Sequence, residues 1–135
     1  MEGLFGSEVV SGCSRAQAIE DGMLVDVSLI EKTGFSYPVA VTRTVWERYI
    51  EWNPEDSKRQ TSQDVYGRLH DILQMLKIAI RSKNDSTDVI FFRVNVVLRN
   101  SISRAKRPRL VKLKAICGPG DNEEPVITIM LPDED

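Results

Sequence analysis

The chain has 135 residues, of which 41% are hydrophobic and 28% charged, and its formal net charge is -2 at pH 7. This length is typical of one domain with one core, and the composition excludes an intrinsically disordered chain. No segment approaches the roughly 18 apolar residues of a membrane span, and the N-terminus lacks the basic and apolar segments of a signal peptide. We therefore expect a single cytoplasmic domain, residues 1–135, that makes no contact with a membrane.

The N-terminal part predicts short helices and short strands. Ser14 and Gln17 have the capping-box spacing of a helix start, and Gly22 can end that helix in a left-handed conformation. Residues 23–27 then alternate as in a short strand, and a second short strand is predicted at residues 39–41, directly after a proline.

A second short helix and one long helix are predicted in the middle of the chain. Thr42 or Thr44 can cap the short helix, and the mixed charges of residues 52–60 predict a mobile loop. The long helix is expected from about residue 62 to residue 82, because its apolar residues recur at helical spacing. Its apolar face contains Val65, Leu69, Ile72, Leu73, Leu76 and Ile80, and widens over Met75, Ile78 and Ala79. A face this wide predicts neighbours on two sides of the helix.

Three strands are predicted in the C-terminal third. Apolar and polar residues alternate from residue 88 to 98, from 110 to 117 and from 126 to 131. The first two match as an antiparallel pair, and a Gly- and Pro-containing turn joins the second to the third. The fold class is therefore α+β: a three-stranded C-terminal antiparallel meander with the long helix on its apolar face and shorter N-terminal helices. The two short N-terminal strands are candidates to extend the sheet.

Several segments resemble a family of small bacterial, plasmid and phage proteins known only as a domain of unknown function. They are residues 4–6, 14–27 and 38–47, and above all the closing segment CGPGDNEEPVITIMLPDED. The resemblance runs nearly from end to end and implies a stand-alone single domain, often carried on mobile elements. It implies no activity and no catalytic or binding residue. The chain departs most from the family at residues 52–60 and 99–108, so a function of those segments would be particular to this protein.

The residue types that catalysis needs are sparse. His70 is the only histidine and falls on the polar face of the long helix, where a solvent-facing role is expected. Glu20, Asp21 and Asp26 cluster near the first strand; they suggest either an acid–base enzyme or, more simply, a solvated loop. The sequence contains no phosphate-binding motif and no Cys/His cluster with metal-ligand spacing, so we expect neither a cofactor nor a metal.

The strongest functional signal is a separation of charge near the C-terminus. Residues 93–114 contain eight Lys or Arg residues and no acid, whereas residues 121–135 contain six acids and no base. The basic residues are Arg93, Arg99, Arg104, Lys106, Arg107, Arg109, Lys112 and Lys114. Three of them, Arg93, Lys112 and Lys114, are predicted on the non-core faces of two strands. The others line or border the segment at residues 100–108, here named the basic connection.

This basic region predicts binding to an acidic protein surface or to nucleic-acid phosphates. Residues 93–114 hold no aromatic side chain to stack on bases, and a pI near 5.5 is low for a nucleic-acid-binding protein. The simplest alternative is a solvated face neutralised by the acidic residues 133–135, either within the chain or across a homodimer. The sequence thus predicts a non-enzymatic binding or regulatory protein acting on a protein or nucleic-acid partner. Direct DNA or RNA binding and a carboxylate enzyme are the alternatives.

Overall fold

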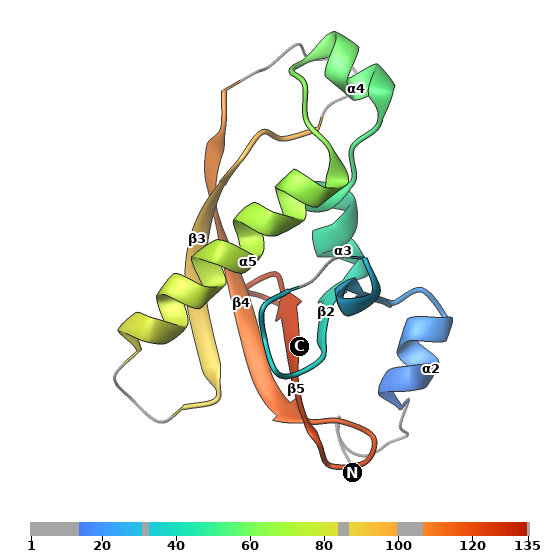
Figure 1. Ribbon diagram of the computed structural model, residues 1–135, viewed down its shortest axis with the longest axis vertical. Coiled ribbons are helices and arrows are strands. Elements are labelled where there is room, and N and C mark those ends of the chain that lie inside the picture. The colour runs from blue at the N-terminus through green and yellow to red at the C-terminus, as the bar shows by residue number, and fades with distance from the viewer. Residues whose placement is uncertain (1–13, 31–32, 84–86, 100–106, 135) are drawn as a thin grey trace.

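The computed structural model describes residues 14–30, 33–83, 87–99 and 107–134. Its strands are β1 (Leu24–Asp26), β2 (Val39–Thr42), β3 (Val89–Val96), β4 (Arg109–Pro119) and β5 (Pro125–Met130). Its helices are α2 (Arg15–Glu20), α3 (Arg43–Val45), α4 (Pro54–Arg59) and α5 (Val65–Ser82), with a 3-10 turn η1 (Val27–Leu29) and a π-helical turn η2 (Trp46–Ile50). The α+β class is confirmed, and Figure 1 shows α5 crossing one face of the sheet.

The five strands form one sheet in the order β1-β2-β5-β4-β3. The predicted meander is confirmed, because β3 pairs antiparallel with β4 and β4 pairs antiparallel with β5. The two short N-terminal strands extend it, but β2 joins β5 in parallel, with Val39 beside Ile127. Since β5 lies in the middle of the sheet, residues on both of its faces are buried, Ile129 on one and Met130 on the other.

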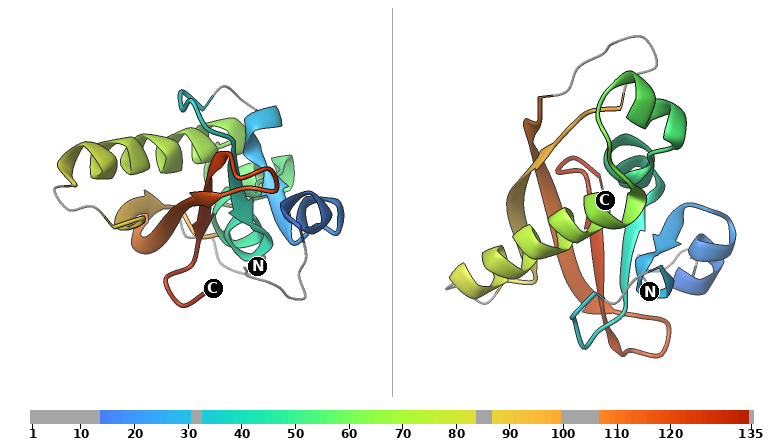
Figure 2. Two further views of the ribbon diagram at one scale, coloured as in Figure 1. Left: turned by 90° about the horizontal axis from the view of Figure 1, so that it is seen from below. Right: turned by 45° about the horizontal axis from the view of Figure 1, so that its top comes forward.

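The main core lies between α5 and the sheet face beneath it. The predicted alternation holds on this face, where Phe92 and Val94 of β3 and Leu113 of β4 are buried. From α5 the buried apolar residues are Leu69, Ile72, Leu73 and Leu76. Helix α5 lies on one side of the sheet, as Figure 2 (left) shows, and the C-terminal tail lies on the other.

The predicted long helix is confirmed as α5, with a start three residues later than expected. The helix begins at Val65 rather than near residue 62, because the Asp64 side chain accepts the Gly67 N–H at 2.7 Å and acts as the N-cap. The predicted neighbours on two sides are present over part of the helix: α5 packs on β3, and its Arg68 also contacts Ile50 and Trp52. The C-terminal half of α5 is covered less. Ile78 is 51% exposed, and Met75 and Ile80 are also exposed. The apolar face of α5 therefore extends beyond the surface that the sheet covers.

Residues 54–59 form helix α4, so the loop predicted at residues 52–60 is wrong. The Asn53 side chain accepts the Asp56 N–H, and the Asp56 carboxylate accepts the Asn53 N–H, which completes a capping box. Pro54 occupies the first helical turn, where its missing N–H is not needed. Asn and Pro are also frequent in loops, but here Asn53 and Pro54 begin a helix.

The first helix forms as predicted. Ser14 Oγ accepts the Gln17 N–H at 3.0 Å, and Gly22 adopts a φ of 78° after the helix. The Gln17 side chain donates to Asp21 rather than back to the Ser14 N–H, so only half of the capping box is present. The sequence prediction was therefore right about the start and wrong about the second hydrogen bond.

Asp121, in the turn between β4 and β5, attaches α2 to the sheet. Its two carboxylate oxygens accept the backbone N–H groups of Arg15 and Ala16 at 2.7 and 3.0 Å. The Arg15 guanidinium continues onto β5, where it donates to Thr128 Oγ1 and to the Ile127 carbonyl. A residue far along the chain thus satisfies N–H groups at the start of α2 that have no partner inside the helix.

This arrangement makes Asp121→Ala a direct test of how α2 is held. The variant leaves two N–H groups without their acceptor, so we expect a loss of about 1–2 kcal/mol in the free energy of unfolding. Urea denaturation measures it. Asn122→Ala in the same turn is the control, because only the backbone N–H of Asn122 takes part in a described hydrogen bond. Equal stability of the two variants would contradict the assigned role of Asp121.

Candidate functional site

Three of the predicted binding residues lie together on the outer face of the sheet, which is the face opposite α5. Arg93 of β3 stands beside Lys112 of β4, and Lys114 follows on the same face. Arg107 precedes β4, and Arg109 begins it on the α5 side, paired with Val96. Arg104 and Lys106 lie outside the described residues. The structure therefore brings together the strand residues of the predicted set.

Arg93 and Lys112 form a cross-strand pair of like charge. They are directly opposite in the register, and both are exposed. Within the described ranges, neither side chain forms an ion pair with a carboxylate. Like charges directly opposite one another destabilise an antiparallel pair, so this pair is unfavourable in the free protein. An anion placed between them would remove the repulsion.

Two exposed apolar side chains flank this basic pair. Phe91 is 53% exposed and Leu110 is 62% exposed, and both point to the outer face. Lys112 Nζ lies 4.9 Å from the centroid of the Phe91 ring, which is a cation–π distance. We name Phe91, Arg93, Leu110 and Lys112 the open face. The sequence analysis did not assign Phe91 to the site, although an aromatic residue on the solvent-facing side of an alternating strand could have indicated it.

A groove joins the open face to helix α5 around the edge of β3. Its volume is about 450 Å³. It is lined by Met75, Ile78 and Ala79 of α5, by Phe91, Phe92 and Arg93 of β3, and by Lys112 of β4. The exposed apolar residues of α5 thus continue into the basic and apolar residues of the open face.

The C-terminal tail meets the basic region at Lys114. Lys114 Nζ donates to the Glu134 carbonyl, and the Glu134 carboxylate accepts from Thr42 Oγ1 and from the Leu131 N–H, both at 2.8 Å. This carboxylate is therefore used within the fold. Within the described part of the chain, the predicted contact between tail and basic region occurs at Lys114, and a main-chain oxygen makes it.

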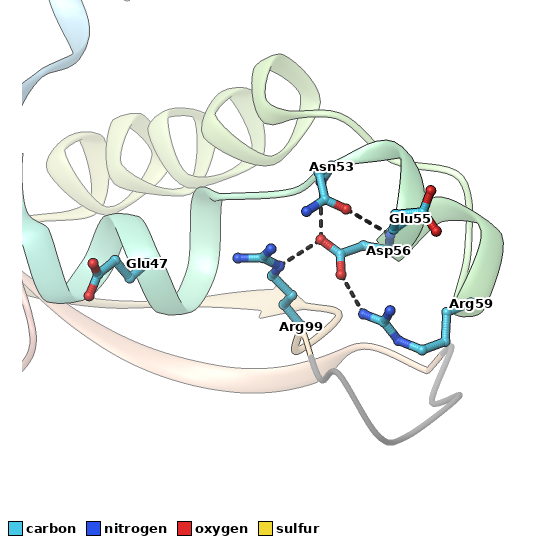
Figure 3. Close-up of a pocket in the computed structure, with 6 residues that line it drawn as sticks. All are labelled: Glu47, Asn53, Glu55, Asp56, Arg59 and Arg99. Atoms are coloured by element: carbon cyan, nitrogen blue, oxygen red, sulfur yellow. Dashed lines mark hydrogen bonds and ion pairs between the residues drawn. The ribbon is translucent and has the colours of Figure 1, made fainter.

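Arg99 belongs to a second cluster, centred on the buried carboxylate of Asp56 (Figure 3). Asp56 is only 2% exposed, and it accepts from Arg99 Nε at 2.6 Å and from the Arg59 guanidinium. Arg99 Nη1 also lies 3.4 Å from a carboxylate oxygen of Glu51. An open cavity of about 430 Å³ adjoins the cluster. Its lining residues are Glu47, Asn53, Glu55, Asp56, Arg59 and Arg99.

The charges of this cluster compensate one another. Burial raises the pKa of Asp56, but hydrogen bonds from the Asn53 N–H, Arg59 and Arg99 outweigh it, so the net pKa lies below its ordinary value. Asp56 is therefore an anion at neutral pH, and Arg99 joins the end of β3 to α4. Through these contacts the cluster holds the chain after β3 against α4.

Arg68 of α5 is buried close to this cluster and links three parts of the chain. It is 5% exposed, and it donates to the Ile50 and Val97 carbonyls at 3.1 and 2.8 Å. Its guanidinium lies 4.4 Å from the centroid of the Trp52 ring. Burial lowers its pKa to about 10, so it stays charged at neutral pH. One of its nitrogens, Nη2, has no hydrogen-bond partner among the residues that the structure describes.

The N-terminal carboxylates act as local hydrogen-bond acceptors. Asp26 accepts the Ser28 N–H and caps η1, and Asp21 accepts from the Gln17 side chain. His70 is exposed on α5. No group of three His, Cys, Asp or Glu residues within the described ranges could hold a metal ion, and none of the described helices is long and apolar enough to cross a membrane. Cys117 is a half-buried free thiol.

A family model covers residues 1–135 of the chain, and the chain therefore belongs to DUF6573, a family of unknown function. No curated protein and no solved structure matches the chain. The membership confirms the resemblance to a family of unknown function, and it assigns no role to any residue.

The Asp56 cluster predicts a pH-dependent stability. Because the folded pKa of Asp56 is lowered, its contribution is complete above the ordinary aspartate pKa of about 4 and is lost as the pH falls through the folded value. Asp56→Asn removes the buried negative charge that accepts from Arg59 and Arg99, so we expect a loss of about 3 kcal/mol in the free energy of unfolding at pH 7. The variant should also lose less further stability than the native protein as the pH falls below about 4.

Urea denaturation across this pH range measures both effects. Glu55→Gln in the same helix is the control, because its pair with Lys58 is exposed and should contribute at most about 1 kcal/mol. If Asp56→Asn were as stable as this control, the buried carboxylate would not be the centre of the cluster.

Proposed function

We propose that this protein is a non-enzymatic binding protein that holds an acidic protein partner on its open face. The observation that carries the proposal is the exposed like-charge pair Arg93–Lys112, which has no carboxylate partner within the described ranges. A carboxylate from a partner would relieve the repulsion and gain two charge-assisted hydrogen bonds. Binding therefore has a source of free energy that folding lacks.

The side chains around the pair favour a protein rather than a small ion. Phe91 and Leu110 offer exposed apolar area beside the charges, and protein interfaces combine an apolar centre with arginines and aromatic residues. In this proposal Lys114 extends the positive charge along the same face of β4, and Arg107 and Arg109 add positive charge at the start of that strand. Arg104 and Lys106 of the basic connection remain predicted binding residues. Arg99 acts by anchoring the start of that connection to Asp56.

A single-stranded nucleic acid is the second candidate partner, and Phe91 is the observation that favours it. An exposed aromatic ring among basic residues on a sheet can stack on a base. The candidate is weaker for two reasons. The Lys112 ammonium already lies over the ring, and the chain as a whole is acidic, with a net charge of -2. The carboxylate-enzyme alternative has less support, because Asp21 and Asp26 serve as local acceptors.

The proposal also includes a cellular compartment and a biological source for this protein. A free Cys117 suits the reducing cytoplasm, and the resemblance of the closing segment suits a bacterium, plasmid or phage. A small regulatory protein of such an element would act by binding a host protein, for which no cofactor is needed.

The variant Arg93→Glu separates stability from binding. It replaces the like-charge pair by an opposite-charge pair with Lys112, so the free energy of unfolding should stay constant or rise by about 0.2–1 kcal/mol. Capture of acidic proteins from the native host, followed by mass spectrometry, should be abolished by the double variant Arg93→Glu, Lys112→Glu. Nuclease treatment should leave the capture by the native protein unchanged.

The double variant Arg48→Glu, Lys58→Glu is the matched control, since it changes the net charge equally at exposed positions outside the open face. Loss of capture in both double variants would indicate a non-specific charge effect and contradict the proposal. Capture that disappears with nuclease, together with oligonucleotide binding that Phe91→Ala weakens, would favour the second candidate.

A further inference from the structure

Strand β3 is an edge of the sheet whose outward backbone groups can be identified residue by residue. Among the strands of the described residues, it pairs with β4 alone. The Cys117 N–H donates to the Asp88 carbonyl at 2.9 Å, so residues 88 and 117 form a hydrogen-bonded pair of the ladder. Such pairs alternate along antiparallel strands. The N–H and C=O groups of Phe91, Arg93 and Asn95 therefore point away from β4, toward the open edge.

The space beside this edge has two chemically different walls. On the outer side stand Phe91 and Arg93, with Lys112 behind them. On the α5 side the groove is apolar, and Met75 and Ile78 of its wall are exposed. An edge strand beside a helix, with an apolar groove between them, is the arrangement in which an extended peptide can be added to a sheet.

We infer that the acidic partner binds as an added β-strand along β3, seated in the groove between this edge and α5. The inference rests on the proposed function, because it specifies how the acidic partner binds. The partner is an extended segment in which acidic and apolar residues alternate. Its backbone forms hydrogen bonds with the backbone groups of Phe91, Arg93 and Asn95, and its side chains lie alternately on the two faces of the sheet.

The alternation follows from the two walls. In an antiparallel addition, the residues opposite Phe91 and Arg93 have side chains on the outer face, where carboxylates meet Arg93 and Lys112. The intervening side chains point to the α5 side, where Met75 and Ile78 offer apolar contact. A segment that is acidic throughout would find partners only in Arg93 and Lys112, and a segment that is apolar throughout would find them only in Met75 and Ile78.

A second copy of this chain fits the edge less well. A symmetric antiparallel pairing centred on β3 would place Arg93 of both copies on the same face near the twofold axis, and Lys112 would add to the positive charge. Like charges in that position disfavour self-pairing, and charged side chains are a common protection of sheet edges. The same charges attract an acidic strand, so charge complementarity favours an acidic partner strand over a second copy of this chain.

The test uses a fluorescein-labelled peptide that alternates Glu and Val, with fluorescence anisotropy as the measurement and the full chain as the receptor. We expect saturable binding that weakens at least about tenfold for a peptide alternating Lys and Val, and also for a peptide with its Glu and Val residues in separate blocks. Only every second amide of an added strand faces β3. N-methylation of the amides in that set should therefore abolish binding, and N-methylation of the amides in the other set should leave binding nearly unchanged.

Asn95→Pro tests the same contact from the protein side. It removes an N–H that points to the open edge and leaves the ladder to β4 intact, a place where proline is tolerated. We expect about a tenfold loss of peptide affinity with the melting temperature within a few degrees of the native protein. Asn95→Ala, which keeps the N–H, should bind as the native protein does.

The outcomes separate the two proposals. Suppose that Arg93→Glu abolishes peptide binding, whereas Asn95→Pro and N-methylation of either set of alternate amides do not weaken it. This result would overturn strand addition and leave the proposed function standing. Binding that Arg93→Glu does not weaken would overturn both. A concentration-dependent dimer that Asn95→Pro dissociates would show that a second copy occupies the edge, and binding of a poly-dT oligonucleotide in place of the peptide would assign the face to nucleic acid. Either of these results overturns the inference.

Discussion

The position of β5 between β2 and β4 is the constraint on which the rest of the structure depends. Parallel pairing with β2 and antiparallel pairing with β4 bury residues on both faces of β5 and join the short N-terminal strands to the C-terminal meander. The short N-terminal strands occupy one side of the sheet, so β3 becomes the opposite edge. The unpaired backbone groups of an eight-residue edge strand could pair with a second copy of the chain, and the charges of Arg93 and Lys112 oppose this self-association. The same charges make the edge selective for an acidic segment.

The Asp56 cluster fixes the far end of this edge. Arg99, just beyond β3, is held by a carboxylate of α4, and Arg68 of α5 donates to the Val97 carbonyl. Buried charges of this kind are weak contributors to net stability, yet removing one partner is strongly destabilising. The cluster therefore specifies one geometry for the end of β3, and it keeps this end aligned with α4 and α5. A rigid edge is ordered before binding, which lowers the entropy lost when a partner strand is added.

The sequence predicted most of the fold because period-two and helical patterns reflect burial directly, as in the alternation around Phe92 and the stripe through Leu76. It did not predict helix α4, since Asn53-Pro54 also begins turns, and the partner that buries Asp56, Arg99, is far away in sequence. The basic strand residues of the site were predicted. The exposed Phe91, the groove beside Ile78 and the open edge were not, because edge position depends on strand order. Strand order was set by the parallel β2–β5 contact, for which the sequence contains no local signal.

The exchange of single backbone amides along β3 tests the central claim most directly. Hydrogen exchange followed by nuclear magnetic resonance should show Ile90, Phe92 and Val94 protected in the free protein, and Phe91, Arg93 and Asn95 exchanging rapidly. Adding the alternating acidic peptide should protect this second set while leaving the first set unchanged. Protection of both sets in the free protein would show that the edge is already covered. No change on peptide addition would show that the partner, if it binds, does not extend the sheet.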